Sequence, residues 1–178
     1  MNRLAEVRAV GFAARQLPGA LLRRGCHTRI ATATHNARFP VVLVHGYVGS
    51  EAVWAPLRAA LADAGFGHLV SLDYSCFDTE AADVSSELGR QARIALARSG
   101  APRVHLVGHS MGGLIVRQTV ARTSLAERTA TAVTIATPHG GAPLGRIAPG
   151  RCARILHRRE PVEPVQVTGR PQRWLAYY

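Results

Sequence analysis

The chain has 178 residues, of which 47% are hydrophobic, and this is enough for one domain with a real core. Its formal charge of +11 would suit a polyanionic partner, but all 22 basic residues are arginine and they are scattered along the chain. A nucleic-acid site gathers its basic residues with interleaved aromatic residues, so we expect no nucleic-acid partner.

Cysteine spacing and hydropathy bear on metal binding, membrane insertion and export. Cys26, Cys76 and Cys152 lack metal-ligand spacing, so we expect free thiols and no metal. No run of about 18 apolar residues could span a membrane, and the N-terminus lacks the pattern of a signal peptide. The default expectation for location is therefore cytoplasmic or membrane-peripheral.

Residues 1–39 are predicted to form a basic N-terminal arm. Leu4, Val7, Gly11 and Ala14 recur at roughly helical spacing among arginines before Pro18 interrupts the pattern. A basic amphipathic helix of this kind would make weak contact with an anionic membrane surface or serve in targeting. A solvated arm that docks loosely on the domain is the alternative.

From Pro40 onward, short apolar runs alternate with amphipathic segments, which is typical of a parallel sheet covered by helices. Strands are predicted at 41–44, 68–72, 103–107 and 130–135, and helices from Ser50 to Gly65, over 79–98 and over 111–122. The first helix would be capped by Ser50, carry Pro56 in its first turn and bury Trp54, Leu57, Leu61 and Ala64. The second would bury Val84, Leu88, Ala92 and Ala95. This order predicts an α/β fold, a three-layer αβα sandwich with a mostly parallel sheet.

Glycine and proline crowd the stretch after Pro138, which we interpret as loop. Residues 154–178 offer only short apolar fragments between prolines and arginines, so a poorly ordered tail is expected there. The predicted domain organisation is an arm at 1–39, a core at 40–153 and a tail at 154–178.

The strongest chemical signal is the run from Gly108 to Gly113, with Ser110 at its centre, between a predicted strand and a predicted helix. It matches the G-x-S-x-G nucleophile elbow, in which the serine occupies a strained turn and small flanking residues let the backbones pass closely. The helix that follows would direct free N–H groups toward developing negative charge. The pattern therefore predicts Ser110 as a catalytic nucleophile.

Two further turns follow predicted strands at the same sheet edge. After 41–44 come His45, Gly46 and Tyr47, where the N–H of Tyr47 together with that of Met111 would form an oxyanion hole. After 130–135 comes the run from Thr137 to Gly141, which contains His139. Taken alone, His139 is interpreted as a loop histidine rather than a base. We expect it to shape the pocket with His45, Gly46 and His109.

These three motifs together resemble the bacterial triacylglycerol lipases and related lipid-remodelling esterases of the α/β-hydrolase superfamily. The resemblance covers about residues 40 to 150. It implies hydrolysis of a hydrophobic ester or lipid through an acyl-enzyme on Ser110, with Tyr47 and Met111 donating to the oxyanion. It implies neither a metal nor an organic cofactor. Thioester, amide or acyl-transfer chemistry fits the same elbow.

The rest of a catalytic triad is not evident. In this fold the acid and then the histidine follow the serine along the chain. The later acids are Glu127, Glu160 and Glu163, and the later histidines are His139 and His157. Glu127 is expected at the opposite sheet edge, and the other two acids lie in the predicted tail. We therefore expect a chain truncated at its C-terminus that lacks the last strands. The alternative function is an impaired hydrolase-like fragment that binds lipid or protein.

Overall fold

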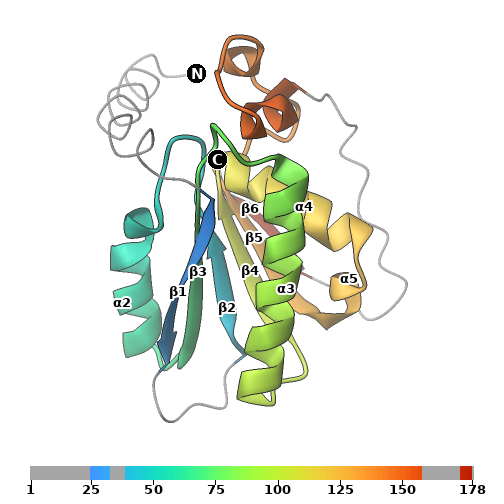
Figure 1. The fold of residues 1–178 in the computed structure, drawn as a ribbon. Coiled ribbons are helices and arrows are strands. Elements are labelled where there is room, and N and C mark those ends of the chain that lie inside the picture. Colours follow the sequence, from blue (N-terminus) through green and yellow to red (C-terminus); the bar gives the residue numbers. More distant parts are fainter. Residues whose placement is uncertain (1–24, 33–38, 158–172, 178) are drawn as a thin grey trace.

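The computed structural model describes residues 25–32, 39–157 and 173–177, which form a single six-stranded sheet with helices on both faces (Figure 1). Its strands follow the order β1-β3-β2-β4-β5-β6. In chain order they are β1 (Cys26–Thr32), β2 (Val41–Val44), β3 (His68–Tyr74), β4 (Val104–His109), β5 (Thr129–Ile135) and β6 (Arg173–Tyr177). All neighbouring pairs are parallel except β1 with β3. The predicted α/β class with a mostly parallel sheet is confirmed.

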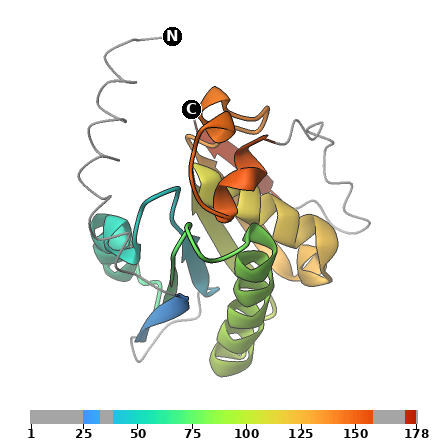
Figure 2. The ribbon, with the colours of Figure 1, turned by 45° about the horizontal axis from the view of Figure 1, so that its top comes forward.

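Helices cover both faces of this sheet. They are η1 (Glu51–Trp54), α2 (Ala55–Asp63), α3 (Ala81–Ser99), α4 (Met111–Arg122), α5 (Leu125–Arg128), η2 (Pro143–Arg146) and η3 (Cys152–His157), where η denotes a 3₁₀ helix. Figure 2 shows α2 on one face and α3 with α4 on the other. The sheet is thus the middle layer of three, as predicted.

The core explains the apolar pattern of the strands. All four residues of β2 are buried, since Val42 and Val44 pack toward α3 and α4 while Val41 and Leu43 pack toward α2. The predicted stripe of α3, namely Val84, Leu88, Ala92 and Ala95, is buried in the larger cluster. Gly100 ends α3 with φ +66°, a left-handed conformation that glycine adopts readily.

The start of the first helix differs from the prediction. Ser50 makes no side-chain capping bond, because the chain enters through the 3₁₀ turn η1 and the carboxylate of Asp73 accepts from the Glu51 N–H at 3.2 Å. Pro56 does lie in the first turn of α2, and Trp54, Leu57 and Leu61 pack in the smaller core cluster. Ala64, predicted to be buried, is exposed because it already lies past the last turn.

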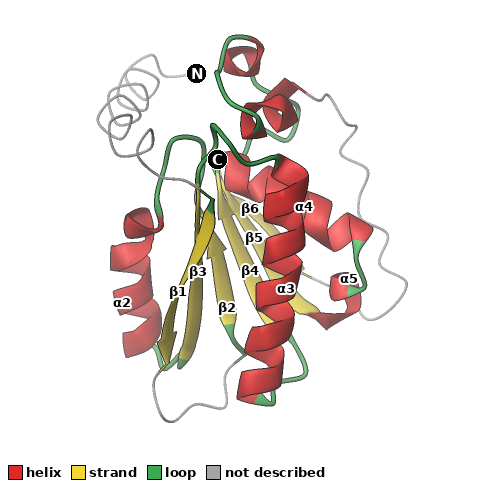
Figure 3. Cartoon of the chain, in the orientation of Figure 1, coloured by secondary structure: helices red, strands yellow, loops and turns green. Residues whose placement is uncertain are grey.

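The two ends of the described chain correct the predicted boundaries (Figure 3). Residues 26–32 were assigned to the arm, yet they form β1, and residues 173–177 were assigned to a poorly ordered tail, yet they form β6. Residues 152–157 form η3 with Leu156 buried. Both strands were missed because a backbone ladder at a sheet edge needs no long apolar run. The sheet therefore gains a parallel strand after β5, where none was expected.

The other predictions for these end segments fall outside the described residues. The sequence predicted an amphipathic helix within residues 1–24, and most of the predicted tail lies within 158–172. Among the residues that the structure does describe, no helix combines the length and hydrophobicity needed to cross a bilayer.

Candidate functional site

The predicted site residues meet at the carboxyl edge of β2 and β4. These two strands are neighbours in the sheet. From β2 the chain goes to β3 on one side and then crosses to β4 on the other side, so the order of the strands reverses between β2 and β4. In open α/β sheets this switch point is where ligands bind. The turn His45–Gly46–Tyr47 follows β2 and Ser110 follows β4, and the structure brings the two together at this point.

Ser110 occupies a strained turn between strand and helix. Its φ of +52° and ψ of −122° are unusual for a residue with a side chain, and strain of this kind costs about 1–3 kcal/mol. The Ser110 N–H donates to the carbonyl of Ile135 at 2.8 Å, and the Gly113 N–H donates to the carbonyl of Ser110 at 3.0 Å. The turn is therefore held from both sides in the geometry expected of a nucleophile elbow.

Glycines allow the backbones at the elbow to touch. A Cβ on Gly108 would lie 2.5 Å from the backbone of Gly113, and a Cβ on Gly46 would lie 2.8 Å from Cβ of Ser110. A Cβ on Gly112 would collide with the carbonyl of Val44. The close approach of the β2 turn to Ser110 therefore depends on the absence of side chains.

Met111 and Tyr47, whose backbone N–H groups the sequence predicts as an oxyanion hole, lie next to Ser110 and next to Gly46 along the chain. Met111 begins α4, where the first N–H groups of a helix have no partner within it. Tyr47 follows Gly46, and its phenol donates to the carbonyl of Pro149 at 2.6 Å. Burial raises the pKa of Tyr47 to about 12, so the phenol keeps its proton for this bond. The side chain thus anchors the residue whose N–H was predicted to bind an oxyanion.

Cys76 supports the same turn, which the sequence did not indicate. Val48 has a φ of +56°, and its N–H donates to Sγ of Cys76 at 3.0 Å. The Cys152 N–H in turn donates to the carbonyl of Cys76 at 3.2 Å, which joins the η3 segment to this layer. All three cysteines are free, as predicted, and burial raises the pKa of Cys152 above its usual range.

His45 is a buried structural residue. Its ring stacks on Tyr74, with centroids 4.2 Å apart, and its Nδ1 lies 2.8 Å from the carbonyl oxygen of Gly46. The Tyr74 N–H donates to Nε2 at 3.3 Å, and the Tyr74 hydroxyl donates to the carbonyl of His45 at 2.7 Å. Both ring nitrogens of His45 are thus within hydrogen-bond distance of a backbone group. His45 therefore fixes the turn from below and is not available for proton transfer.

His109 ends β4 beside the elbow, half-buried, with its ring 6.5 Å from that of Trp54 in an edge arrangement. Burial lowers the pKa of His109, and the nearby His45 lowers it further. The neutral ring is therefore favoured at this position. Its backbone carbonyl and Nδ1 lie close to Gly46.

His139 lies in the turn after β5. Its Nε2 is 3.0 Å from Oγ1 of Thr134, while its Nδ1 is buried without a partner in the described part of the chain. A base must lie within about 3.2 Å of the hydroxyl that it activates, and neither ring nitrogen bonds Ser110. Burial lowers the pKa of His139, and the charge of Arg117 lowers it further. Thr137 of the same turn packs against Gly113, so this segment braces the elbow.

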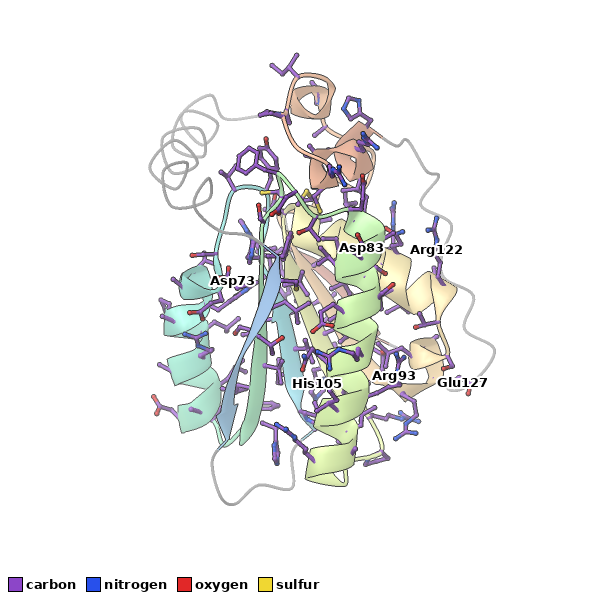
Figure 4. The ribbon with its side chains drawn as sticks, viewed as in Figure 1. Asp73, Asp83, Arg93, His105, Arg122 and Glu127 are labelled. Atoms are coloured by element: carbon purple, nitrogen blue, oxygen red, sulfur yellow. The ribbon has the colours of Figure 1, made fainter. Side chains whose placement is uncertain are left out.

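The carboxylates that could serve as a triad acid lie away from the elbow or outside the described residues. Glu127 belongs to α5, ahead of β5, and Figure 4 shows it toward the end of the molecule opposite the loops that follow β2 and β4. Asp73 lies 3.4 Å from Nε2 of His45. Glu160 and Glu163 fall outside the described residues, while His157 is exposed in η3. Within the described residues, no group of histidine, cysteine and carboxylate side chains could hold a metal ion.

The carboxyl end of β6 reaches the same edge. The Ala136 N–H donates to the carbonyl of Tyr177 at 2.7 Å, and Ala136 has a φ of +48°. Three neighbouring parallel strands, β4, β5 and β6, thus bring their carboxyl ends to the side of the sheet that carries Ser110.

Comparison with known proteins agrees with this geometry. The sequence profile described as "Alpha/beta hydrolase family" matches residues 41–178. A triacylglycerol lipase from Burkholderia plantarii is 31% identical over 156 residues, which cover 79% of this chain and 42% of the relative. A triacylglycerol lipase from Pseudomonas fragi is 32% identical over 131 residues, which cover 68% of this chain and 43% of the relative.

Solved structures share the fold. The crystal structure of a mature lipase from Bacillus licheniformis superposes with a TM-score of 0.61 at 20% identity, covering 74% of this chain and 60% of that one. The chain spans less than half the length of the two curated relatives.

The glycines of the elbow give a first prediction. Gly108→Ala should destabilise the fold by about 1–3 kcal/mol or more, because the new methyl group would overlap the backbone of Gly113. Gly140→Ala is the matched control, since nothing lies within 4 Å of its added Cβ. Urea denaturation measures both. Equal midpoints for the two variants would contradict the tight packing described here.

The lowered pKa of His109 predicts a pH dependence of stability. As the pH falls, His109 is protonated in the unfolded state before it is protonated in the folded state. The contribution of His109 to the free energy of unfolding is therefore complete above about pH 6.5, and it is lost as the pH falls through the lower pKa of the folded state. His109→Gln should therefore reduce the loss of stability between about pH 7.5 and about pH 5. His105 and His139 also have lowered pKa values, so part of the loss should persist. Urea midpoints measure the difference, and an unchanged loss would contradict the burial of His109.

Proposed function

This chain belongs to the α/β hydrolase family, and we propose that it carries the nucleophile half of a serine esterase, which cleaves carboxylic esters of hydrophobic acyl chains through an acyl-enzyme on Ser110. The observation that carries the proposal is the backbone of Ser110. A residue with a side chain is held at φ +52° at the end of β4, at the switch point of the sheet. Strained backbone conformations of this kind cluster at functional sites, and this turn presents the Ser110 hydroxyl at the edge of the sheet where ligands bind.

The reaction begins with attack of Ser110 Oγ on the ester carbonyl. The carbonyl oxygen gains negative charge in the tetrahedral intermediate, and the N–H groups of Tyr47 and Met111 are assigned to stabilise it. Collapse of the intermediate breaks the bond to the alcohol oxygen, which takes up the proton that the Ser110 hydroxyl loses, so the alcohol leaves and the acyl group stays on Ser110. Water then attacks the acyl-enzyme, and one of its protons returns to Ser110 Oγ as the acid is released. The tight contact of Gly46 with Ser110 supports this assignment, because it brings the Tyr47 turn beside the nucleophile.

The substrate class rests on the relatives and on the surroundings of the site. Both curated relatives are triacylglycerol lipases, which act on hydrophobic esters. The half-buried rings of Tyr47 and Phe77 lie close by, with their centroids 6.5 Å apart. An apolar acyl chain would gain more from these surfaces than a polar group would.

The acid and the base of a triad follow the serine along the chain and approach from the same edge. We assign His139 to bracing the elbow rather than to proton transfer, since Thr134 holds its Nε2. The end of β6 reaches the edge next to Ala136, and we propose this side of the edge as the approach for an acid.

Labelling and turnover test the proposal. The purified chain should form one covalent adduct with a fluorophosphonate, in which a bond from Ser110 Oγ to phosphorus replaces the bond to fluoride. Intact-mass spectrometry measures the adduct, and hydrolysis of a short and a long p-nitrophenyl ester measures turnover. Ser110→Ala should abolish the adduct and reduce any turnover to the rate in buffer, a loss of several powers of ten for an active enzyme.

The neighbouring Ser75 provides a control. It is buried beside Cys76 and is not at the elbow, so Ser75→Ala should still form the adduct. An adduct that persists in Ser110→Ala would contradict the role of Ser110. So would the absence of an adduct in both the parent chain and Ser110→Ala, together with equal rates of ester hydrolysis.

A further inference from the structure

A cavity lies apart from the elbow, between the start of α3, α4 and η3. Its volume is about 210 Å³, smaller than the roughly 300–1,000 Å³ of pockets that enclose drug-sized ligands. The cavity therefore suits a small group rather than a whole lipid.

Arginines dominate its wall. Arg117 and Arg122 come from α4, Arg151 precedes η3, and Arg154 lies within η3. Glu80 is the one carboxylate of the lining. Figure 4 shows Arg122 at the end of α4, on the side of the sheet that carries α3. Two segments that are distant in sequence, α4 and the η3 segment, thus bring four positive charges to one cavity.

The guanidinium groups of two of these four arginines lack a partner among the described residues. Arg154 Nη1 lies 3.5 Å from Oε1 of Glu80, and Arg117 donates to the carbonyl of His139 at 3.3 Å. The guanidinium groups of Arg122 and Arg151 have no ion-pair or hydrogen-bond partner among the described residues. Like charges that line one cavity repel one another, so an anion in the cavity would relieve the repulsion.

We propose that this cavity binds the phosphate group of a phosphomonoester. A phosphate dianion and the Glu80 carboxylate together would offset three of the four positive charges. Guanidinium groups donate paired hydrogen bonds to phosphate oxygens, and a phosphate dianion offers one more negative charge and one more acceptor oxygen than a carboxylate does. The phosphate group fits the small volume, while the rest of the ligand would extend through the mouth lined by the exposed Arg122, Arg151 and Arg154.

This site goes beyond ester hydrolysis and does not depend on it. Leu114 and Arg117 line the cavity four and seven positions after Ser110, so the cavity begins about 6–10 Å along α4 from the nucleophile. Arg117 is shared, because it lines the cavity and also contacts the turn of His139 that braces the elbow. Binding in the cavity is measurable whether or not the chain turns over an ester.

Calorimetric titration of the full chain with glycerol 3-phosphate tests the proposal at constant ionic strength. Binding should saturate at one site and weaken by about tenfold or more in the double variant Arg122→Gln with Arg151→Gln, since two charge-assisted contacts are lost. Arg93→Gln with Arg98→Gln is the matched control, because both arginines are exposed on α3, do not line the cavity and carry the same charge. Circular dichroism and the urea midpoint verify that both double variants fold.

Glu80→Gln should act in the opposite direction. Removing the carboxylate should tighten binding, because it frees Arg154 and removes the one negative charge of the lining. Co-sedimentation with phosphatidic acid vesicles, against phosphatidylcholine vesicles, distinguishes a lipid headgroup from a soluble phosphomonoester as the source of the phosphate. Saturable binding of either source that the cavity variant loses and the control retains supports the site.

Three results would overturn it: no saturable binding to either source, equal weakening in the cavity variant and the control, or acetate binding as tightly as glycerol 3-phosphate. Equal weakening would mean that the net charge of +11 attracts anions without a specific site. Failure of this test would leave the labelling of Ser110 untouched, so the two proposals stand or fall separately.

Discussion

The contact between two backbones at the switch point governs the arrangement of the site. The turn after β2 lies against the elbow after β4, with Gly46 packed on Ser110 and Gly112 packed under the carbonyl of Val44. Side chains at these positions would separate the turn from the serine by the thickness of a methyl group. Because the interior of a protein is close-packed, such a displacement cannot be absorbed locally. The orientation of α4 and the position of the Tyr47 N–H both follow from this contact.

A second layer holds the contact in place. Tyr74 and His45 stack beneath the β2 turn, Cys76 accepts from Val48, and Pro149 accepts from the Tyr47 phenol. These partners come from β3, from the loop after it and from the segment before η3. The loops over the sheet edge are therefore joined to the β2 turn by hydrogen bonds rather than by hydrophobic contact alone. Any movement of the segment around Pro149 would be transmitted to Tyr47.

The sequence predicted the central elements well because their signals are local. Four residues of β2 are buried on both faces, and the Gly108–Gly113 run can form one kind of turn between a strand and a helix. The boundaries of α4 and the stripe of α3 followed from periodicity for the same reason. What the sequence could not indicate depends on partners that are distant along the chain. The Asp73 carboxylate that replaces the Ser50 cap, the Cys76 thiol and the edge strands β1 and β6 all depend on such partners. The arginine cavity likewise gathers residues that look scattered in the sequence.

Val48, Ser110 and Ala136 share an uncommon feature, since each has a side chain and a positive φ. They lie on the loops after β2, β4 and β5, three adjacent strands of the sheet. At about 1–3 kcal/mol each, their strain is comparable to much of the net stability of an ordinary domain. The edge that presents Ser110 is thus also where relief of backbone strain would stabilise the fold. Substitutions that relieve the strain at Val48 and Ala136 would raise thermal stability. A homologue adapted to high temperature that keeps both strained residues would indicate that these loop conformations are needed for more than stability.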